Sequence, residues 1–382
     1  MNRITGTYAT STTLGEPVRA FVPHPLPPAA PPLAAASFVD LNRQAELALA
    51  RLSGVTGLVP SVDWLLYSAV RKEALLTSQI EGTQATLTDL FDEEAGVKIS
   101  NTDDVAEVTN YLRAFRLVQE QLRDPKGLPI SVRLLCDAHR LLLDGARGAG
   151  KQPGELRHSQ NWIGGTRPGN AVFVPPPPEN VPELLANLER FIHEESDALP
   201  PLVKIALIHA QFETIHPFLD GNGRIGRLLI AALLEHWNLL AEPLMYLSGY
   251  LKQHQAEYYR RLSVIRTEGD WESWVSFFVE GVAVSAAQAE KNIIAVASLI
   301  ATDRRKLLQS PKASPATYRL FELLPMMPRF TVERVRQQLE TTFPTANAAV
   351  QTLVQLGIVA EVTGQKKNRS YSYQAYVDLL TQ

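Results

Sequence analysis

Twelve consecutive residues, from His216 to Arg227, constrain this chain of 382 residues more than any other stretch. They read His-Pro-Phe-Leu-Asp-Gly-Asn-Gly-Arg-Ile-Gly-Arg. An apolar run at 202–215 precedes them and another at 228–240 follows them, so the sequence predicts two core helices joined by this loop. An ordinary connection between helices accounts for one glycine and one asparagine. It does not account for a histidine, an aspartate and two arginines together, and we therefore interpret the loop as a functional site.

The glycines and arginines of this loop are typical of a phosphate-binding site. Gly221 and Gly223 allow the backbone to turn sharply and to expose N–H groups. The helix that follows presents its positive N-terminal end to an anion. Arg224 and Arg227 lie three positions apart on the first turn of that helix, so both guanidinium groups can reach phosphate oxygens.

Two other side chains of the loop supply reactive chemistry. Asp220 is an oxygen ligand of the kind that Mg²⁺ accepts alongside phosphates. His216 is placed to take a proton from an incoming nucleophile. Together with the phosphate-binding groups, they indicate transfer of a phosphate-containing group.

The whole loop resembles the signature of the Fic (filamentation induced by cAMP) family at every defining position. The resemblance implies a mainly α protein, with a Fic-fold helical bundle and a small β-hairpin flap, that transfers AMP from ATP to hydroxyl side chains of proteins. His216 would be the catalytic base, Asp220 would hold Mg²⁺, and ATP would be the nucleotide. The implied nucleotide-binding residues within the loop are Asp220, Gly221, Asn222, Gly223, Arg224, Ile225, Gly226 and Arg227.

A second motif ends a helix that the pattern predicts from Ser61. Thr77 and Glu81 are four positions apart and share a face, and Gly82 suits a helix end. A glutamate there is ordinarily a solvated charge. However, Thr-x-x-x-Glu-Gly resembles the inhibitory motif of Fic proteins that carry it before the catalytic core. The resemblance implies that Glu81 pairs with Arg227 and obstructs placement of the ATP γ-phosphate.

Two short β-like runs around Gly-Thr-Arg-Pro-Gly-Asn predict a hairpin between residues 161 and 174. Taken alone, this is an exposed hairpin. The Fic resemblance places here the flap that aligns the target segment, because such an edge can pair with an extended peptide. The flap residues expected to face nucleotide and target are Ile163, Gly164 and Gly165.

Aromatic and histidine residues near the loop are read mainly as core. His209 lies two turns before His216, and we expect it to be a core histidine rather than a second base. Tyr258 and Tyr259 fit a packed helix, although by similarity to Fic proteins the pair falls where the nucleotide base is held. Arg266 departs from the asparagine that some family members have near the base, and its role is open.

The C-terminal segment has the pattern of a winged helix-turn-helix, with predicted helices at 316–324, 331–339 and 344–356 and a wing at 358–374. From residue 311 onward, eight Lys or Arg face five Asp or Glu, a net charge of +3. This modest excess leaves open DNA binding, with Lys366, Lys367 and Arg369 on phosphates, or a protein contact such as a homodimer.

Composition sets the class of protein. With 45% hydrophobic and 20% charged residues, the chain is globular, and its formal charge of −3 implies no strong overall attraction to nucleic acid or membrane. One cysteine, no signal-peptide run and no membrane span predict a cytoplasmic protein without an internal disulfide. The predicted segments are a Pro-rich arm (1–37), a helical region with the inhibitory helix (38–125), the Fic core and following helices (126–310) and the winged-helix-like domain (311–382).

Two alternatives to AMP transfer remain. The first is a Fic-family enzyme that transfers UMP, phosphate or phosphocholine, or that removes AMP with Glu81 helping to position water. The second is a transcription regulator that acts through its C-terminal domain. Under the main interpretation the acceptor is a Ser, Thr or Tyr hydroxyl of a protein partner, and self-modification is expected.

Overall fold

The computed structural model describes residues 3–145, 150–195, 199–365 and 369–381. Its contacts divide the chain into two compact units. Unit 1 is Met1–Ala50, Asn110–Ala241 and Leu247–Ser285, and unit 2 is Arg51–Thr109, Glu242–Tyr246 and Ala286–Gln382. Within the described residues, no helix is both long and apolar enough to cross a lipid bilayer.

Unit 1 is built on two central helices, as the loop pattern predicts. These are α7 (Pro201–Ile215) and α8 (Asn222–His236), and every residue of α7 after the first is buried. A helix that is apolar on all sides needs neighbours on all sides. Helix α8 packs along α7, helices α6 (Val181–His193) and α10 (Gln255–Glu268) contact it, and Trp274 of α11 (Trp271–Leu308) donates to the Ala206 carbonyl at 2.8 Å. Unit 1 also contains α5 (Val132–Leu142), α9 (Leu247–Gln253), the second part of α4 (Thr102–Arg123) and the first part of α1 (Val39–Gly54).

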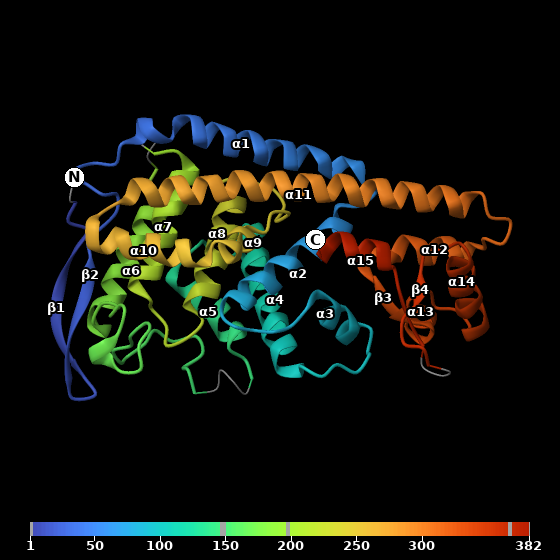
Figure 1. Ribbon diagram of the computed structural model, residues 1–382, viewed down its shortest axis with the longest axis horizontal. Coiled ribbons are helices and arrows are strands. Elements are labelled where there is room, and N and C mark those ends of the chain that lie inside the picture. The colour runs from blue at the N-terminus through green and yellow to red at the C-terminus, as the bar shows by residue number, and fades with distance from the viewer. Residues whose placement is uncertain (1–2, 146–149, 196–198, 366–368, 382) are drawn as a thin grey trace. The chain divides into compact units, whose positions relative to one another are not determined.

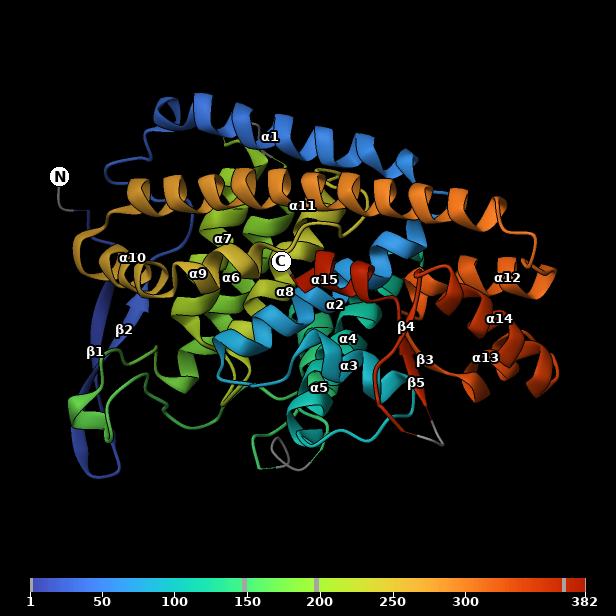
Figure 2. The ribbon, with the colours of Figure 1, turned by 45° about the vertical axis from the view of Figure 1, so that its right-hand side comes forward.

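The N-terminal segment differs from the predicted extended arm. Residues Gly6–Thr13 (β1) and Glu16–Pro23 (β2) form an antiparallel hairpin. The turn residues Leu14 and Gly15 both have positive φ, at 51° and 80°, which is what a two-residue hairpin turn requires. Leucine is an unusual residue for such a turn, so the sequence carries no Asn-Gly signal. Figures 1 and 2 show the hairpin beside α10.

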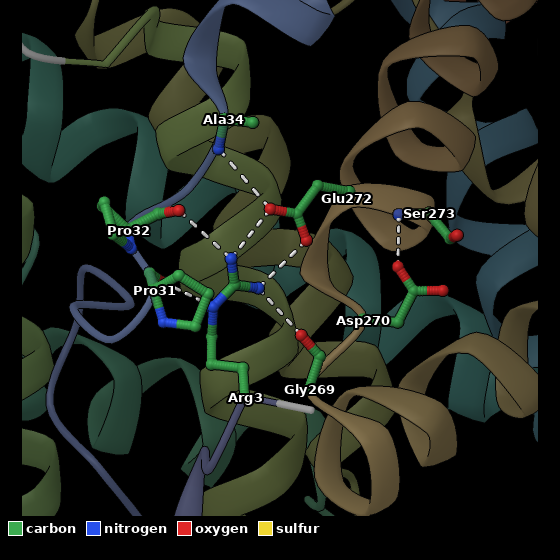
Figure 3. Close-up of polar contacts among 8 residues, drawn as sticks. All are labelled: Arg3, Pro31, Pro32, Ala34, Gly269, Asp270, Glu272 and Ser273. Carbon is green, nitrogen blue, oxygen red and sulfur yellow. Dashed lines mark hydrogen bonds and ion pairs between the residues drawn. The ribbon is translucent and has the colours of Figure 1, made fainter. Parts of the chain in front are cut away.

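The proline-rich segment that follows the hairpin is fixed to unit 1 by Arg3. Its guanidinium donates to the carbonyl oxygens of Pro31 (2.7 Å) and Pro32 (3.2 Å) and forms an ion pair with Glu272 at 2.8 Å (Figure 3). It also donates to the carbonyl of Gly269, at the junction of α10 and α11 (2.8 Å). Residues 24–34 of the predicted Pro-rich arm are therefore anchored to unit 1 by a buried arginine.

Unit 2 contains α2 (Val62–Ile80), α3 (Leu87–Glu94), the remaining parts of α1, α4 and α11, and the C-terminal elements. The predicted cap of α2 is confirmed, because the Ser61 hydroxyl accepts from the N–H of Asp63. Tyr246 belongs to this unit too, and its hydroxyl accepts from the amide of Asn292. Short 3₁₀ turns complete the chain: Ala35–Phe38, Val55–Leu58, Pro168–Asn170, Pro178–Asn180 and Leu324–Met326.

The C-terminal segment has the predicted helices and wing strands, and two elements beyond them. The chain order is α12 (Pro315–Leu323), β3 (Arg329–Thr331), α13 (Val332–Gln338), α14 (Phe343–Gln355), β4 (Ala360–Glu361), β5 (Ser370–Ser372) and α15 (Gln374–Thr381), with the sheet order β3-β5-β4. These two elements, β3 and α15, were not predicted, and neither was α3 of the helical region. The predicted cap at Thr331 is confirmed.

The described charges of this segment are largely engaged within unit 2. Arg329 pairs with Asp92 of the helical region at 3.1 Å, and Arg336 pairs with Glu333. Helix α14 carries no lysine or arginine. Lys366 and Lys367 lie outside the described residues, so DNA binding through them stays a prediction.

Candidate active site

The loop between α7 and α8 is held in one conformation by the two residues at its ends. Helix α7 ends at His216, whose backbone is left-handed (φ 49°) and whose N–H donates to the Phe212 carbonyl (2.9 Å). Helix α8 begins after Gly221, also left-handed at φ 76°. A side chain at residue 221 would be strained, and its Cβ would come within 3.1 Å of Leu142. A histidine at positive φ persists only where its surroundings impose it.

Asn222 closes the loop from inside. Its side-chain oxygen accepts from the N–H of Phe218 and its amide donates to the carbonyl of the same residue, both at 2.8 Å. Asn161 donates to that carbonyl as well, at 3.2 Å. The buried amide of Asn222 therefore determines the shape of the loop. If Asn222 binds nucleotide as predicted, it does so through its backbone N–H, because its side chain is engaged with Phe218 and the first N–H groups of a helix have no partner within the helix.

Arg157 holds the backbone of His216, and this role was not predicted from the sequence. It is 1% exposed, and its guanidinium donates to the carbonyls of His216 (2.9 Å), Pro176 (2.6 Å), Ser159 (3.3 Å) and Ile215 (3.4 Å). Burial lowers the pKa of Arg157 to about 10, so it remains charged at neutral pH. Five donors in a planar fork suit several carbonyl acceptors at once. Arg157 thereby fixes the backbone on which the candidate base stands.

His139 of α5 supports the other side of the loop. Its ring stacks on Phe218 at 3.9 Å between centroids, and its Nδ1 accepts from the N–H of Gly154 at 2.9 Å. Its Nε2 then carries the proton and donates to the carbonyl of Asp220 at 3.0 Å. Burial lowers the pKa of His139 to about 4, so the ring is neutral, as this hydrogen-bond pattern requires.

The charged groups of the loop are arranged as a phosphate site requires. Asp220 is exposed, and its carboxylate accepts from the N–H of Gly221 at 2.7 Å. The Arg224 guanidinium lies 3.9 Å from that carboxylate. Arg224 and Arg227 are 5% and 3% exposed, and both side chains interact with other groups of the protein. Gly226 has no room for a side chain, because its Cβ would lie 2.5 Å from the Glu213 carboxylate.

The structure separates the remaining aromatic candidates into core and surface. His209 is buried, its Nδ1 donates to the carbonyl of Gly226 (3.2 Å), and its Nε2 accepts from the Tyr258 hydroxyl (2.9 Å). Burial lowers the pKa of His209 to about 3. It is a core histidine, as expected. Tyr258 is 1% exposed and Tyr259 is 47% exposed, so only Tyr259 offers a ring to a ligand.

The predicted flap is a loop with a single β-bridge rather than two strands. Ile163 and Phe173 form the bridge, and the N–H of Val172 also donates to Ile163. Gly164 and Gly165 follow at φ 67° and 73°, and both are exposed. The bridge defines the base of the flap. Its tip is held by the 3₁₀ turn at Pro168–Asn170 and by the Asn170 side chain, which accepts from the N–H groups of Thr166 and Arg167 at 3.0 Å.

The inhibitory motif belongs to unit 2. Glu81 is the exposed C-cap residue of α2, and Gly82 follows at φ 100°. Thr77, one turn earlier, is completely buried. Arg227 belongs to unit 1, and its pairing with Glu81 stays a prediction.

The loop fits a nucleotide held with a divalent cation. Within the described residues, no group of three or more His, Cys, Asp or Glu could hold a metal ion. A cation at Asp220 would therefore need phosphate oxygens to complete its coordination, as Mg²⁺ commonly does. The exposed carboxylate, the glycine turn and the N-terminal end of α8 meet in the same few residues, which matches that requirement.

Comparisons with known proteins agree with this geometry. The model of the Fic/DOC family N-terminal region matches residues 39–120, and the Fic/DOC family model matches residues 129–234. The protein adenylyltransferase Fic of Drosophila ananassae is 29% identical over 216 residues, which cover 53% of this chain and 38% of the relative. That of Drosophila melanogaster is 29% identical over 213 residues, with the same coverage. The chain thus spans well under half the length of these relatives.

Solved structures show the same fold. A Fic family protein from Desulfovibrio desulfuricans G20 superposes with a TM-score of 0.58 at 22% identity, covering 90% of this chain and 97% of that one. Residues 134–508 of Fic-1 from C. elegans superpose with a TM-score of 0.51 at 23% identity, covering 68% of this chain and 72% of that one. The mainly helical fold predicted from the sequence is confirmed.

Proposed function

The chain belongs to the Fic/DOC family, and from this premise we propose that it is a protein adenylyltransferase that transfers AMP from Mg·ATP to a Ser, Thr or Tyr hydroxyl of a protein. One observation carries the proposal: a single rigid loop presents His216, the carboxylate of Asp220 and the N-terminal end of α8 together. A base and an anion site at this spacing suit attack of a hydroxyl on a phosphate.

In the proposed reaction, an imidazole nitrogen of His216 accepts the proton of the attacking hydroxyl. The hydroxyl oxygen bonds to the α-phosphorus of ATP, the bond from that phosphorus to the β-phosphate oxygen breaks, and pyrophosphate leaves. Arg224 and Arg227 bind phosphate oxygens, where negative charge develops. Asp220 would hold Mg²⁺, which when bound neutralises part of the phosphate charge.

Substrate placement falls to the flap and the aromatic surface. Ile163, Gly164 and Gly165 would align an extended segment of the target, because the flap's backbone edge can pair with a strand. Tyr259 is the ring available to a nucleotide base. The protein itself is a candidate acceptor, as the self-modification hypothesis states.

Glu81 would set the resting activity. A carboxylate paired with Arg227 competes with the ATP γ-phosphate for the same guanidinium. The apo enzyme would then be held in a low-activity state, with Thr77 only helping to orient the end of α2.

Mass spectrometry of the purified full chain after incubation with Mg·ATP tests the proposal. The expected result is the mass of one or more AMP groups on hydroxyl side chains of Glu81→Gly protein, and none on the same protein with His216→Ala. Incubation with UTP in parallel addresses the alternative donor. Addition of phosphate or UMP alone, or loss of AMP from a premodified protein without any transfer, would replace the proposal by the corresponding alternative.

A further inference from the structure

A cleft of about 320 Å³ lies between the β1–β2 hairpin, the second half of the flap and the end of α10. All three belong to unit 1, and the Thr5 hydroxyl donates to the Ile265 carbonyl of α10 at 2.9 Å. Two arginines line the cleft, Arg19 from β2 and Arg266 from α10, and none of its lining residues is acidic. The wall therefore carries a local positive charge on a chain whose formal net charge is −3.

Each guanidinium stacks on an aromatic ring. The Cζ of Arg266 lies 3.7 Å from the ring centroid of Phe173, and that of Arg19 lies 4.4 Å from the ring centroid of Tyr8. Stacking holds the guanidinium plane and leaves the N–H groups at its edge available. Within the described part of the chain, neither side chain makes a hydrogen bond or an ion pair.

Arg266 is the less exposed of the two, since it is half-buried whereas Arg19 is exposed. Burial lowers its pKa to about 10, and the group remains charged at neutral pH. The negative charge of Glu213 partly offsets this effect of burial. A half-buried guanidinium that lines a cleft gains from a further carboxylate, because a charge-assisted hydrogen bond is stronger where water is partly excluded.

The rings beneath the two guanidiniums are joined in a row through Phe21. Tyr8 contacts Phe21 at 5.3 Å between centroids, and Phe21 contacts Phe173 at 6.4 Å. Two carboxylates on an extended peptide can each meet one of the two guanidiniums. The row also continues the flap, because the N–H of Phe21 donates to the Val174 carbonyl at 3.0 Å.

The hairpin wall of the cleft is tied to the rest of unit 1 before any ligand arrives. Arg3 joins the proline-rich segment after the hairpin to Gly269 and Glu272, just beyond the last turn of α10 (Figure 3). Glu272 also accepts from the N–H of Ala34 at 3.4 Å. A preformed site loses less conformational entropy on binding.

We propose that this cleft binds an acidic segment of the protein substrate, with one Asp or Glu carboxylate on Arg19 and another on Arg266. The inference rests on the proposed transfer of AMP to proteins, and it adds the substrate class: a hydroxyl residue with acidic residues nearby in the same extended segment. Charge-assisted, bidentate contacts of arginine with carboxylate supply the selectivity.

The test uses the full chain and two fluorescent peptides of equal length, each with one threonine, flanked by glutamates in one and by glutamines in the other. Binding is measured by anisotropy without nucleotide. We expect the Glu peptide to bind about tenfold more tightly, the effect of one to two charge-assisted contacts. Arg266→Gln and Arg19→Gln should each remove most of this preference, and Arg266→Glu should favour a lysine-flanked peptide.

Arg167→Gln is the matched control. Arg167 is an exposed arginine of the flap that pairs with Glu16 and does not line the cleft, so this variant should keep the preference. Equal binding of both peptides, or an equal loss in all three glutamine variants, would overturn the inference. Arg19 is exposed on a strand, so its variant should fold even where the Arg266 variant does not.

Two further readouts separate the cleft from the proposed chemistry. Displacement of the Glu peptide by Mg·ATP, with ATP rather than peptide affinity lost in Arg266→Gln, would assign the guanidinium to the nucleotide and overturn the inference. Selective peptide binding without AMP transfer from labelled ATP to peptide or protein would leave the cleft supported and reject the proposed function.

Discussion

The loop at 216–222 and the flap at 163–173 are held by very different means. Buried side chains fix the loop: Arg157 holds the carbonyl of His216, His139 holds that of Asp220, and Asn222 holds Phe218. The flap has one bridge at its base and exposed glycines beyond it. Buried polar networks that are fully satisfied rigidify a structure, whereas exposed loops with few contacts open readily.

The difference teaches how the labour is divided. The groups that would act on ATP in the proposed reaction are positioned by contacts that exist without any substrate, which is what catalysis by preorganised groups needs. The flap would take its final shape from the target. The loop should therefore tolerate few changes, and the flap should tolerate many.

The largest effect is expected from His216→Ala, which removes the base and leaves the loop's backbone contacts. AMP transfer should fall by roughly 100- to 10,000-fold, because a positioned base contributes that much. The dissociation constant of Mg·ATP should hardly change, since the phosphate groups meet other residues. Single-turnover transfer and calorimetric ATP binding would measure both. Transfer at the wild-type rate would exclude His216 as the base.

Arg157→Lys tests the buried hydrogen bonds that hold the loop. Lysine keeps the charge but cannot reach four carbonyls, so several buried acceptors lose their donors. We expect a loss of about 3 kcal/mol in the free energy of unfolding, and a fall in kcat for the molecules that remain folded. Urea unfolding and transfer assays below the transition would measure the two effects.

Arg167→Gln is the matching change in the flap. It removes an exposed ion pair with Glu16, which should cost under about 1 kcal/mol. Similar losses of stability from the two arginine changes would contradict the contrast between loop and flap.

Glu81→Gly sharpens the comparison by asking where regulation acts. Under the proposed competition of Glu81 for Arg227, removing the Glu81 carboxylate should raise self-modification by roughly tenfold, the effect of about one charge-assisted contact. Arg227→Ala in the same protein should abolish the gain, and Thr77→Ala alone should have a smaller effect. Quantitative mass spectrometry of the modified protein is the readout. Equal self-modification of wild type and Glu81→Gly would return Glu81 to an ordinary helix-end charge.

The sequence predicted the loop and its two helices because the evidence for them is local. The glycines, the charged residues and the apolar periodicity of the loop and its helices fall within one continuous stretch. The hydroxyl caps at Ser61, Ser131 and Thr331 are likewise determined by neighbouring residues. Local hydrogen bonds of this kind depend on residues two or three positions apart.

What the sequence did not reveal depends on contacts between distant segments. Arg157 looks like an ordinary charge in a glycine-rich loop until the carbonyls of residues 176, 215 and 216 surround it. His139 showed only helical spacing. Strand β3 exists through its pairing with β5, about 40 positions later in the chain. Helix α3 is the exception, because its capping box of Thr86 and Asp89 was a local signal that we did not use.

The last prediction concerns the pH dependence of stability and tests the neutral histidine that supports the loop. The folded-state pKa of His139 is lowered to about 4 and that of His209 to about 3, both by burial, from an ordinary value near 6.5. Below pH 6.5 the unfolded chain therefore binds protons that the folded chain does not. The stabilisation is complete above pH 6.5 and declines as the pH falls toward 4, by up to about 1.4 kcal/mol per pH unit for each histidine.

His139→Gln retains an amide donor for the Asp220 carbonyl and does not titrate. Between pH 6.5 and 4.5, its free energy of unfolding should decline less steeply than that of wild type, by up to the contribution of one histidine. Guanidinium unfolding at several pH values gives both slopes, and the change of an exposed histidine, His158→Gln, is the matched control. Identical slopes in wild type and His139→Gln would show that the ring is not neutral in the folded protein, and that the hydrogen bonds assigned to its two nitrogens are wrong.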